Sequence, residues 1–558
     1  MSLLFNSRRS SVYATHGMVS TSQPLASQAG LSILQKGGSA ADAAVAAAAV
    51  LNLTEPGSTG IGGDMFLLYY DARTTQVSAL NGSGRAPADL TIERVERDGL
   101  RAGDAISDPF HAHCVTVPGA CSGWSETLKR YGRMSFADVL APAIQLAEEG
   151  FPVAPLTSAA WQLGAERQLG LKHRGDELTI GGRAPYAGDR FKNPGLARTF
   201  RVVAEGGAEA FYSGEIAKKI VAAVQKFGGV MTLADLAAHR VTDEPAISTT
   251  YRGVRVWECP PNGQGLTALI ALNILEGFEL DGGALSAERL HLVIEALRLA
   301  FADARWFIAD PATNPAPVEA LLSKAYATAR RKLIHRTKAT ADQKAGRPIA
   351  GTDTVYFCVV DGEGNAASFI NSNYMGFGTG IVPGGTGFAL QNRGHNFSLN
   401  REHPNALAPG KRPYHTIIPA MLTRDMTPPG PRSRKGANAP LPMHELVGPF
   451  GVMGGFMQPQ GHVQVVINLI DDALDPQSAL DRPRVSLDDG TPDSRVAIED
   501  GIGFDVAAKL AGMGHNVMPV SVASRSVFGR GQIIMRNKDN AVLCAGSDPR
   551  ADGCAVGW

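Results

Sequence analysis

The chain has 558 residues, which is too many for one ordinary domain and enough to bury a large core. Its 53 basic and 53 acidic residues cancel, so the charge points to neither a nucleic acid nor an anionic membrane as partner. The composition, 44% hydrophobic and 19% charged, is typical of a globular protein and excludes a disordered chain.

Cysteine usage and the N-terminal segment bear on the compartment. Arg8 and Arg9 interrupt the first residues before any stretch is apolar enough for a signal peptide. No window approaches 18 continuous apolar residues, so no membrane span is expected. Six cysteines form no CxxC motif and no pairing pattern, which predicts free, buried thiols in a reducing compartment: Cys114, Cys121, Cys259, Cys358, Cys544 and Cys554. Together these features predict a cytoplasmic protein.

Two helices are predicted first in chain order, over residues 25–36 and 39–52, with a pair of glycines between them. Ser39 followed by Asp42 resembles a capping box in which the acid replaces the usual Glu. The second helix is small and apolar on nearly every side, which indicates a helix that is buried and closely packed.

A buried strand and a further helix follow. The run 65–70 (Met-Phe-Leu-Leu-Tyr-Tyr) predicts a buried strand. Apolar residues at helical spacing predict a helix over 285–305, with one face toward the core.

The pattern changes at Thr354. Residues 354–360 predict a strand, 361–365 a turn and 366–372 a returning strand, so Thr354 would stand at the head of a hairpin. The proline-rich segment 427–442 predicts a surface loop.

Short motifs that are weak singly occur in a recognisable order over more than 500 residues. They are Gly17-Met-Val-Ser, Gly37-Gly-Ser-Ala-Ala-Asp-Ala-Ala-Val45, Gly60-Ile-Gly-Gly63, Asp353-Thr-Val-Tyr, Val359-Val-Asp, Gly364-Asn, Phe377-Gly-Thr-Gly-Ile381, Lys411-Arg-Pro413, Gly454-Gly455 and Gly546-Ser-Asp-Pro-Arg550. In this order the sequence resembles the γ-glutamyltranspeptidase family of N-terminal-nucleophile hydrolases, and the resemblance covers almost the whole chain.

The resemblance implies a four-layer αββα sandwich made from one precursor that cuts itself between Asp353 and Thr354. The products would be residues 1–353, the large subunit, and 354–558, the small catalytic subunit, interleaved in one fold. A hydroxyl is a weak nucleophile unless a base takes its proton. Once Thr354 is N-terminal, its own α-amine can be that base, with an ordinary pKa of about 7.7–8.0. Thr352 is the rival nucleophile, but it breaks the register of the strand.

Three further residues receive catalytic roles from the resemblance. Ser372 takes the position whose hydroxyl contacts and tunes the nucleophile. Gly454 and Gly455 align with the glycines whose N–H groups form the oxyanion hole, a task that needs close backbone approach.

The substrate pocket departs from relatives that bind γ-glutamyl groups. There an Asp and a neighbouring Gln hold the α-ammonium, whereas this chain has Asn396 and Arg393. Losing the negative charge and gaining a positive one disfavours an ammonium, since a buried uncompensated charge is costly. The sequence therefore favours an acidic acyl group that has no α-amine.

Other pocket positions change as well. The Arg that holds the α-carboxylate in those relatives aligns with Ser83, and the nearest basic residue is Arg85. An Asn is replaced by Tyr374, and a Ser pair by His415-Thr416. We expect Arg85, Arg393 and His415 to offer positive charge to a carboxylate, although His415 could equally be a satisfied core histidine. The segments around residues 411–416 and 454–462 look closest to the oxamate amidohydrolase branch.

These observations leave alternatives open. A true γ-glutamyltransferase or glutathione hydrolase remains possible, as does an unprocessed, non-catalytic relative that binds a small acid. His111-Ala-His-Cys114 has no metal-ligand spacing, and no glycine run has the order of a phosphate loop. We expect no metal and no cofactor, a small-molecule amide as substrate, and the chain's own two fragments as partners.

Overall fold

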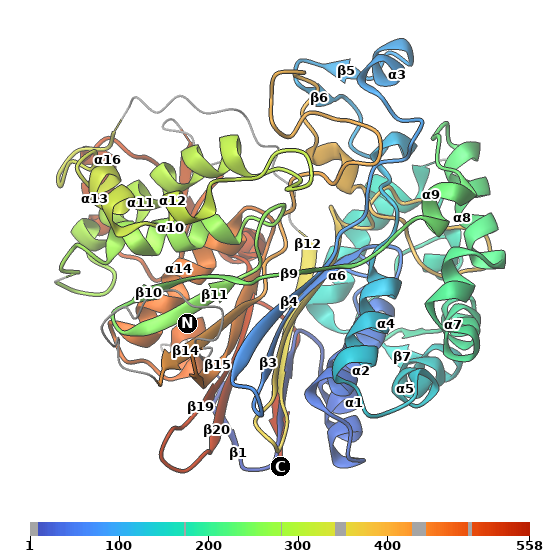
Figure 1. The fold of residues 1–558 in the computed structure, drawn as a ribbon, viewed down its shortest axis with the longest axis horizontal. Helices are drawn as coiled ribbons and strands as arrows, with labels where there is room; N and C mark the ends of the chain where they lie inside the picture. The colour runs from blue at the N-terminus through green and yellow to red at the C-terminus, as the bar shows by residue number, and fades with distance from the viewer. Residues whose placement is uncertain (1–8, 172–173, 281, 341–352, 427–441, 489–493) are drawn as a thin grey trace, which may run out of the picture.

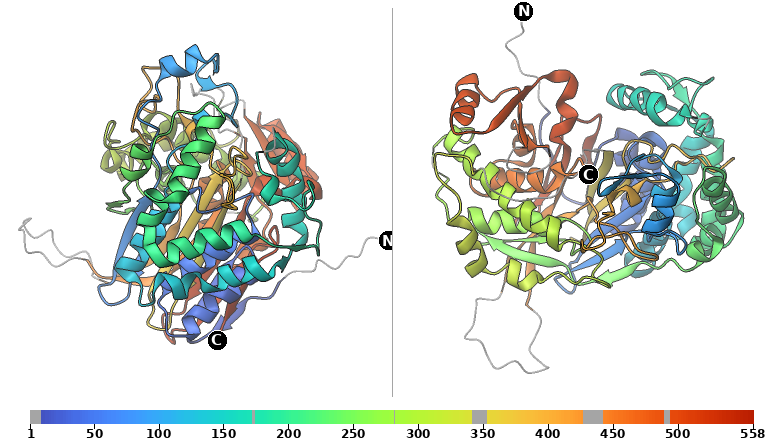
Figure 2. Two further views of the ribbon diagram at one scale, coloured as in Figure 1. Left: turned by 90° about the vertical axis from the view of Figure 1, so that its right-hand side faces the viewer. Right: turned by 90° about the horizontal axis from the view of Figure 1, so that it is seen from above.

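The computed structural model describes residues 9–171, 174–280, 282–340, 353–426, 442–488 and 494–558. In this part of the chain two seven-stranded antiparallel sheets pack face to face, and helices cover both outer faces (Figure 1). Figure 2 shows the same layers from the side and from above. The predicted four-layer αββα sandwich is confirmed.

The first sheet consists, in spatial order, of β1 (Val12–Ala14), β20 (Leu543–Ser547), β19 (Arg530–Arg536), β15 (His444–Met453), β14 (Ala420–Asp425), β11 (Val254–Glu258) and β10 (Ile247–Tyr251). The second consists of β21 (Cys554–Gly557), β2 (Met18–Thr21), β12 (Asp353–Val360), β13 (Ala366–Tyr374), β3 (Asp64–Asp71), β4 (Gln76–Gly82) and β9 (Thr242–Glu244). Each sheet mixes strands from before and after residue 353, so the two parts of the chain share one fold.

The helices fall into two layers. Those on the side of the second sheet are α1 (Pro24–Gln35), α2 (Ala40–Thr54), α4 (Ala120–Tyr131), α5 (Phe136–Glu149), α6 (Pro155–Gly164), α7 (Pro194–Tyr212), α8 (Glu215–Lys226) and α9 (Leu233–Ala237). Those on the side of the first are α10 (Gly265–Leu275), α11 (Ala287–Phe307), α12 (Val318–Leu321), α13 (Lys324–Arg331), α14 (Met457–Ile470), α15 (Pro476–Asp481) and α16 (Phe504–Gly512).

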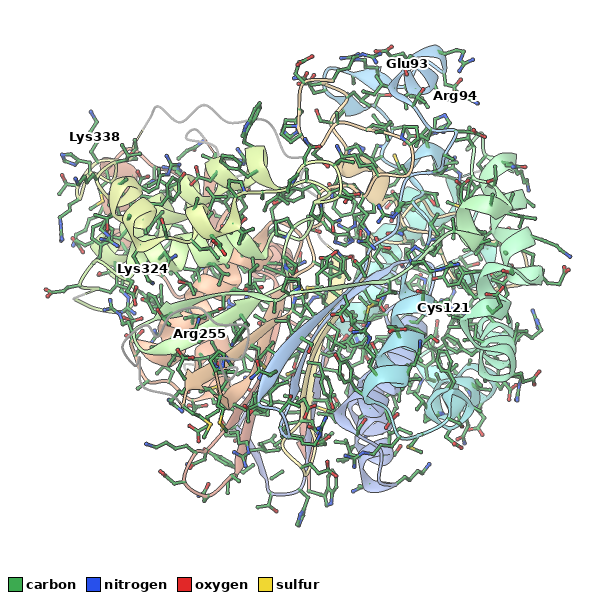
Figure 3. The ribbon with its side chains drawn as sticks, in the orientation of Figure 1. Glu93, Arg94, Cys121, Arg255, Lys324 and Lys338 are labelled. Carbon is green, nitrogen blue, oxygen red and sulfur yellow. The ribbon has the colours of Figure 1, made fainter. Side chains whose placement is uncertain are left out.

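Smaller elements lie outside the four layers. They are a three-stranded sheet of β16 (Val485–Leu487), β17 (Arg495–Glu499) and β18 (Asn516–Val520), the strand pairs β5 (Arg101–Ala102) with β6 (Ala105–Ile106) and β7 (Phe151–Pro152) with β8 (Arg190–Phe191), and the helix α3 (Ile92–Arg97). Figure 3 labels Glu93 and Arg94 on α3, which projects beyond the sheets.

Helix α2 confirms the prediction of a buried helix of small residues. All of its residues are buried, and alanines let it pack closely on β12 and β13. Its capping box is complete: Ser39 Oγ accepts from the Asp42 N–H (3.3 Å), and the Asp42 carboxylate accepts from the Ser39 N–H (2.8 Å).

The predicted hairpin forms the centre of the second sheet. Along β12, Val355, Phe357 and Val359 face the helix-side core, whereas the residues between them face the core between the sheets. Both faces of the strand are therefore buried, which explains its continuous apolar run.

Other predictions are settled more briefly. The helix expected over 285–305 is α11, and the strand expected over 65–70 is β3. The loop expected over 427–442 lies outside the described residues except for Pro442. All six cysteines are free, four of them buried. Among the described residues, no helix is long and apolar enough to cross a membrane.

Candidate active site

Thr354 lies near the start of β12, deep inside the fold, with 1% of its surface exposed. Asp353 pairs with Tyr374, but Val355 pairs with Asn371, so the register between β12 and β13 shifts at Thr354. Such an irregularity redirects a side chain and is common beside active sites. It sets Thr354 apart from an ordinary strand threonine.

Ser372 is the immediate neighbour of this threonine. The two hydroxyl oxygens, Thr354 Oγ1 and Ser372 Oγ, are 3.0 Å apart. The backbone N–H of Tyr374 also donates to Ser372 Oγ, at 2.9 Å. The structure thus brings together the predicted nucleophile and the hydroxyl expected to tune it.

Arg393 joins the same cluster from a short 3₁₀ turn, Arg393–Asn396. Its Nη2 donates to Ser372 Oγ (3.0 Å) and its Nη1 to Thr416 Oγ1 (2.7 Å). The guanidinium stacks on the Tyr374 ring, 4.4 Å from the centroid. Burial lowers the pKa of Arg393 to about 10, which still leaves it charged at neutral pH.

Tyr374 adopts a backbone φ of +80°, which is rare for a residue with a side chain. Such a conformation costs on the order of 1–3 kcal/mol and needs support from its surroundings. Here it directs the backbone N–H to Ser372 and the ring to Arg393.

His415 departs from the expectation that it supplies positive charge. It is fully buried, its Nε2 lies 3.0 Å from the Asp64 carboxylate, and its Nδ1 accepts from the Ile417 N–H. Burial and the charge of Arg393 lower the pKa of His415 to about 3, so the ring is neutral and donates from Nε2. The reading of His415 as a satisfied core histidine is the one that fits.

Asp64, which the sequence analysis missed, is the buried anion of the site. It stands at the head of β3, directly across from Ser372. Its Oδ1 accepts from the Gly84 N–H and from Gln391 Nε2, both at 2.9 Å. Burial raises the pKa of Asp64, but bonds from His415 and Gln391 and the charge of Arg393 outweigh burial and lower it. An acid directly before the apolar run 65–70 was the available signal.

Arg85 and Asn396 are held apart from this cluster. The Arg85 guanidinium pairs with the buried carboxylate of Asp310 (3.0 Å) and donates to the Gly410 carbonyl (3.2 Å). Asn396 Nδ2 donates to the Tyr414 carbonyl (3.1 Å). Among the described residues, neither side chain contacts Thr354, Ser372 or Arg393.

Gly454 and Gly455 form the turn between β15 and α14, with φ values of 131° and 57°. No acceptor among the described residues takes a hydrogen bond from either N–H. Gln264, a residue the sequence analysis missed, donates through Nε2 to the carbonyls of Gly455 (2.8 Å) and Thr416 (2.6 Å). It ties the glycine turn to the segment that carries Thr416.

Several predicted features lie elsewhere. Thr352 is outside the described residues. His113 Nε2 bonds to Asp98 at 2.7 Å, and His111 Nδ1 accepts from the His113 N–H, so both are engaged locally.

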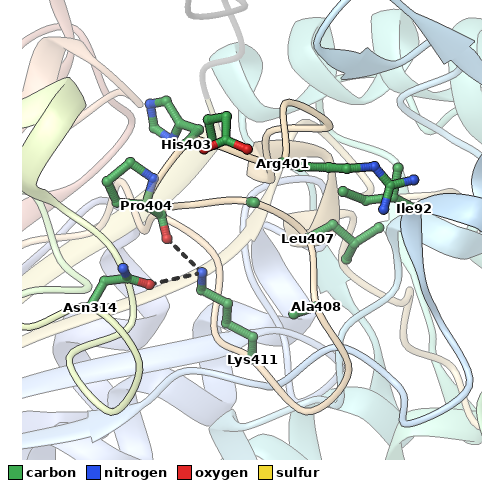
Figure 4. A pocket seen from close by; sticks show the side chains of 10 residues that line it. Ile92, Asn314, Arg401, His403, Pro404, Leu407, Ala408 and Lys411 are labelled. Carbon is green, nitrogen blue, oxygen red and sulfur yellow. Dashed lines mark hydrogen bonds between the residues drawn. The ribbon is translucent and has the colours of Figure 1, made fainter.

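A pocket of about 440 Å³ opens beside the loop that carries residues 401–411 (Figure 4). Ile92, Leu407 and Lys411 line it, and Lys411 Nζ donates to the Pro404 carbonyl and to Asn314. The Thr354 cluster is not part of its lining.

One group of possible metal ligands occurs in the described part of the chain, formed by His291, Glu295 and His515. Their ligand atoms lie within 4.8 Å of one another. Arg298 already donates to Glu295 (2.9 Å) and to His515 Nδ1 (3.1 Å), and a second hydrogen bond joins the two histidines. The guanidinium occupies the ligand atoms that a cation would need.

The arrangement suits acyl transfer. A buried hydroxyl, a second hydroxyl 3.0 Å away, a fixed cation and a turn with two available N–H groups are the components that a threonine nucleophile uses.

Comparisons with known proteins agree with this chemistry. The sequence model described as gamma-glutamyltranspeptidase matches residues 26–558. The glutathione hydrolase-like YwrD proenzyme of Bacillus subtilis is 37% identical over 552 residues, which cover 98% of this chain and 99% of that protein. The oxamate amidohydrolase proenzyme of Klebsiella pneumoniae is 33% identical over 563 residues, covering 98% and 100%.

The crystal structure of cephalosporin acylase from Bacillus halodurans superposes with a TM-score of 0.90 at 45% identity, covering 100% of this chain and 98% of that one. The chain therefore belongs to the gamma-glutamyltranspeptidase family of N-terminal-nucleophile hydrolases and is an enzyme that hydrolyses or transfers amide-linked acyl groups.

Proposed function

We propose that the protein cuts itself between Asp353 and Thr354 and then hydrolyses the amide of a small acidic acyl group through an acyl-enzyme on Thr354. The observation that carries the proposal is the contact of the buried Thr354 hydroxyl with Ser372, which Arg393 holds in turn. Relatives named as proenzymes support the self-cleavage.

Self-cleavage would start with attack of Thr354 Oγ1 on the carbonyl carbon of Asp353. The C–N bond breaks as the C–O bond forms, and the hydroxyl proton ends on the new α-amine. Water then opens the ester and leaves fragments of 353 and 205 residues. Because both sheets contain strands from both fragments, we expect them to stay together after the cut.

In turnover, the α-amine of Thr354 would take the hydroxyl proton as the oxygen attacks the substrate carbonyl. The N–H groups of Gly454 and Gly455 would stabilise the oxyanion, and the protonated amine would give its proton to the leaving amine. Water, or an amine acceptor, would then release the acyl group.

Arg393 supports an acidic acyl group. It is the fixed cation in contact with Ser372, and its buried Nε has no hydrogen-bond partner among the described residues. A guanidinium binds carboxylates well and repels an ammonium. The chain also has the neutral Asn396 where γ-glutamyl-binding relatives have an Asp, so γ-glutamyl compounds are the second candidate class.

The names of relatives suggest which amides to test. Oxamate carries its acid next to the amide carbonyl, and the likeness to a cephalosporin acylase suggests glutaryl amides. Both groups are acids without an α-amine. We infer that one of these two classes is the substrate.

Intact mass spectrometry of the purified protein beside Thr354→Ala tests the cleavage. Fragments of 353 and 205 residues in the wild type and one uncut chain in the variant would establish the nucleophile. A wild type that stays whole after long incubation would favour a non-catalytic relative. Turnover of γ-glutamyl-p-nitroanilide with oxamate and glutaryl amides untouched would refute the substrate class.

A further inference from the structure

The hydrogen bonds around Ser372 fix the direction of its contact with Thr354. Ser372 Oγ accepts one bond from the Tyr374 N–H and another from Arg393 Nη2. A hydroxyl oxygen has two lone pairs, and these two donors use both. The part of the Ser372 hydroxyl left for the 3.0 Å contact with Thr354 Oγ1 is its hydrogen.

Thr354 is therefore the acceptor in this contact. Its own hydrogen stays available for transfer to a base, and negative charge that develops on Oγ1 meets a donor already in place. Without the bond from Arg393, Ser372 could rotate and accept from Thr354 instead, which would hold back the proton that must leave.

The charge of Arg393 acts on the same atoms. Two hydrogen bonds of 3.0 Å each separate the guanidinium from Thr354 Oγ1, and the α-amine of the cut chain is on the same residue. A buried cation this close opposes protonation of a neighbouring amine.

Other charged and titratable groups nearby do not reverse this effect. Asp64 is engaged by His415, which is neutral, and it also faces Arg393. Glu55 pairs with Arg530 at 3.5 Å on the strand next to Gly454, and Tyr374 stays protonated because burial raises its pKa.

We propose that Arg393 is a positioning residue for the nucleophile: it makes Ser372 a donor to Thr354, and its charge keeps the α-amine in its neutral, proton-accepting form. The proposal rests on cleavage before Thr354, and it adds to the role of Arg393 toward the substrate acid. One residue would then serve both substrate selection and activation of the threonine.

The test compares Arg393→Gln and Arg393→Lys with wild type, and with Arg401→Gln as a control that removes a half-exposed cation paired with Glu93. The α-amine is titrated directly, by the pH dependence of its carbamoylation with cyanate, read by mass spectrometry of the 205-residue fragment. This readout needs no substrate. The pH profile of kcat/KM is measured with one acidic and one neutral acyl anilide.

Arg393→Gln should raise the pKa of the α-amine by about one unit or more, since the cation goes and Asp64 remains. It should shift the acid limb of the pH profile equally for both anilides. Arg393→Lys keeps the charge but not the paired bonds, so the pKa should stay within about 0.3 units while kcat falls about tenfold or more. Arg401→Gln should change neither.

An unchanged α-amine pKa in Arg393→Gln, with a raised KM for the acidic anilide alone, would overturn the proposal and leave a substrate-binding role. If Arg393→Gln does not fold, an unchanged kcat in Arg393→Lys would overturn the part concerning Ser372. A wild-type chain that never cuts would refute the proposed function and this inference together, and intact mass shows that outcome separately.

Discussion

Replacing Asp64 by Asn tests whether the buried anion holds the site together. The asparagine can keep its oxygen toward the Gly84 N–H and Gln391, but its amide NH₂ then meets the Nε2–H of His415, donor against donor. His415 cannot simply move its proton to Nδ1, because that nitrogen accepts from Ile417.

The magnitude follows from these contacts. One hydrogen bond to a charged group is lost, worth about 1.5–3 kcal/mol. Arg393 also loses the negative charge it faces, and removing one partner of a buried pair costs about 3–5 kcal/mol. The two figures overlap because both include the charge, so we expect a loss of about 3 kcal/mol in the free energy of unfolding.

Urea denaturation of Asp64→Asn in the Thr354→Ala background, where the chain should stay uncut, measures this loss. The pKa of Asp64 is lowered from its ordinary value of 3.8, so its contribution is full above that value and disappears as the pH falls through the lowered pKa. The difference should therefore be equal at pH 7 and pH 5. Asp243→Asn, at an exposed pair with Arg130, is the control and should cost under about 1 kcal/mol. A loss under 1 kcal/mol for Asp64→Asn would refute the reasoning.

Two further predictions concern the predicted pocket. Arg85→Gln should leave KM for an acidic anilide within about threefold of wild type, because Asp310 holds this guanidinium away from the cluster; a tenfold rise in KM would restore Arg85 to the pocket. Gly454→Ala should lower kcat about 100-fold, because its φ of 131° disfavours a side chain and an added Cβ would lie 3.0 Å from Gly529, disturbing an oxyanion donor. Single-turnover kinetics with intact-mass control would check it, and undiminished kcat would rule out that role.

Local patterns predicted the fold well. The capping box at Ser39 and the hairpin after Thr354 depend on neighbours in sequence, so spacing alone was enough to find them. The family resemblance supplied the layers, which no periodicity reveals. The register shift at Thr354 could not be predicted, because it depends on how β13 pairs with β12.

The substrate pocket was harder because sequence gives residue types and not their partners. Arg85 and His415 looked like cations open to a ligand, yet Asp310 holds one and Asp64 with Ile417 holds the other. Both acids lie far from their partners in the chain. Gln264 was missed for the same reason: its two acceptors are carbonyls that carry no sequence signal.

The charges of the site form an ordered arrangement. Asp64 is buried and could repel an acidic substrate, but it is covered by His415 and balanced by Arg393. Arg393 remains the charge that contacts the Thr354 cluster directly. A neutral histidine between the anion and the nucleophile keeps hydrogen bonding without adding a second cation. The site thus presents one net direction of charge, toward an acid and away from an ammonium. This is why we place substrate selection in Arg393 and the support for its charge in Asp64.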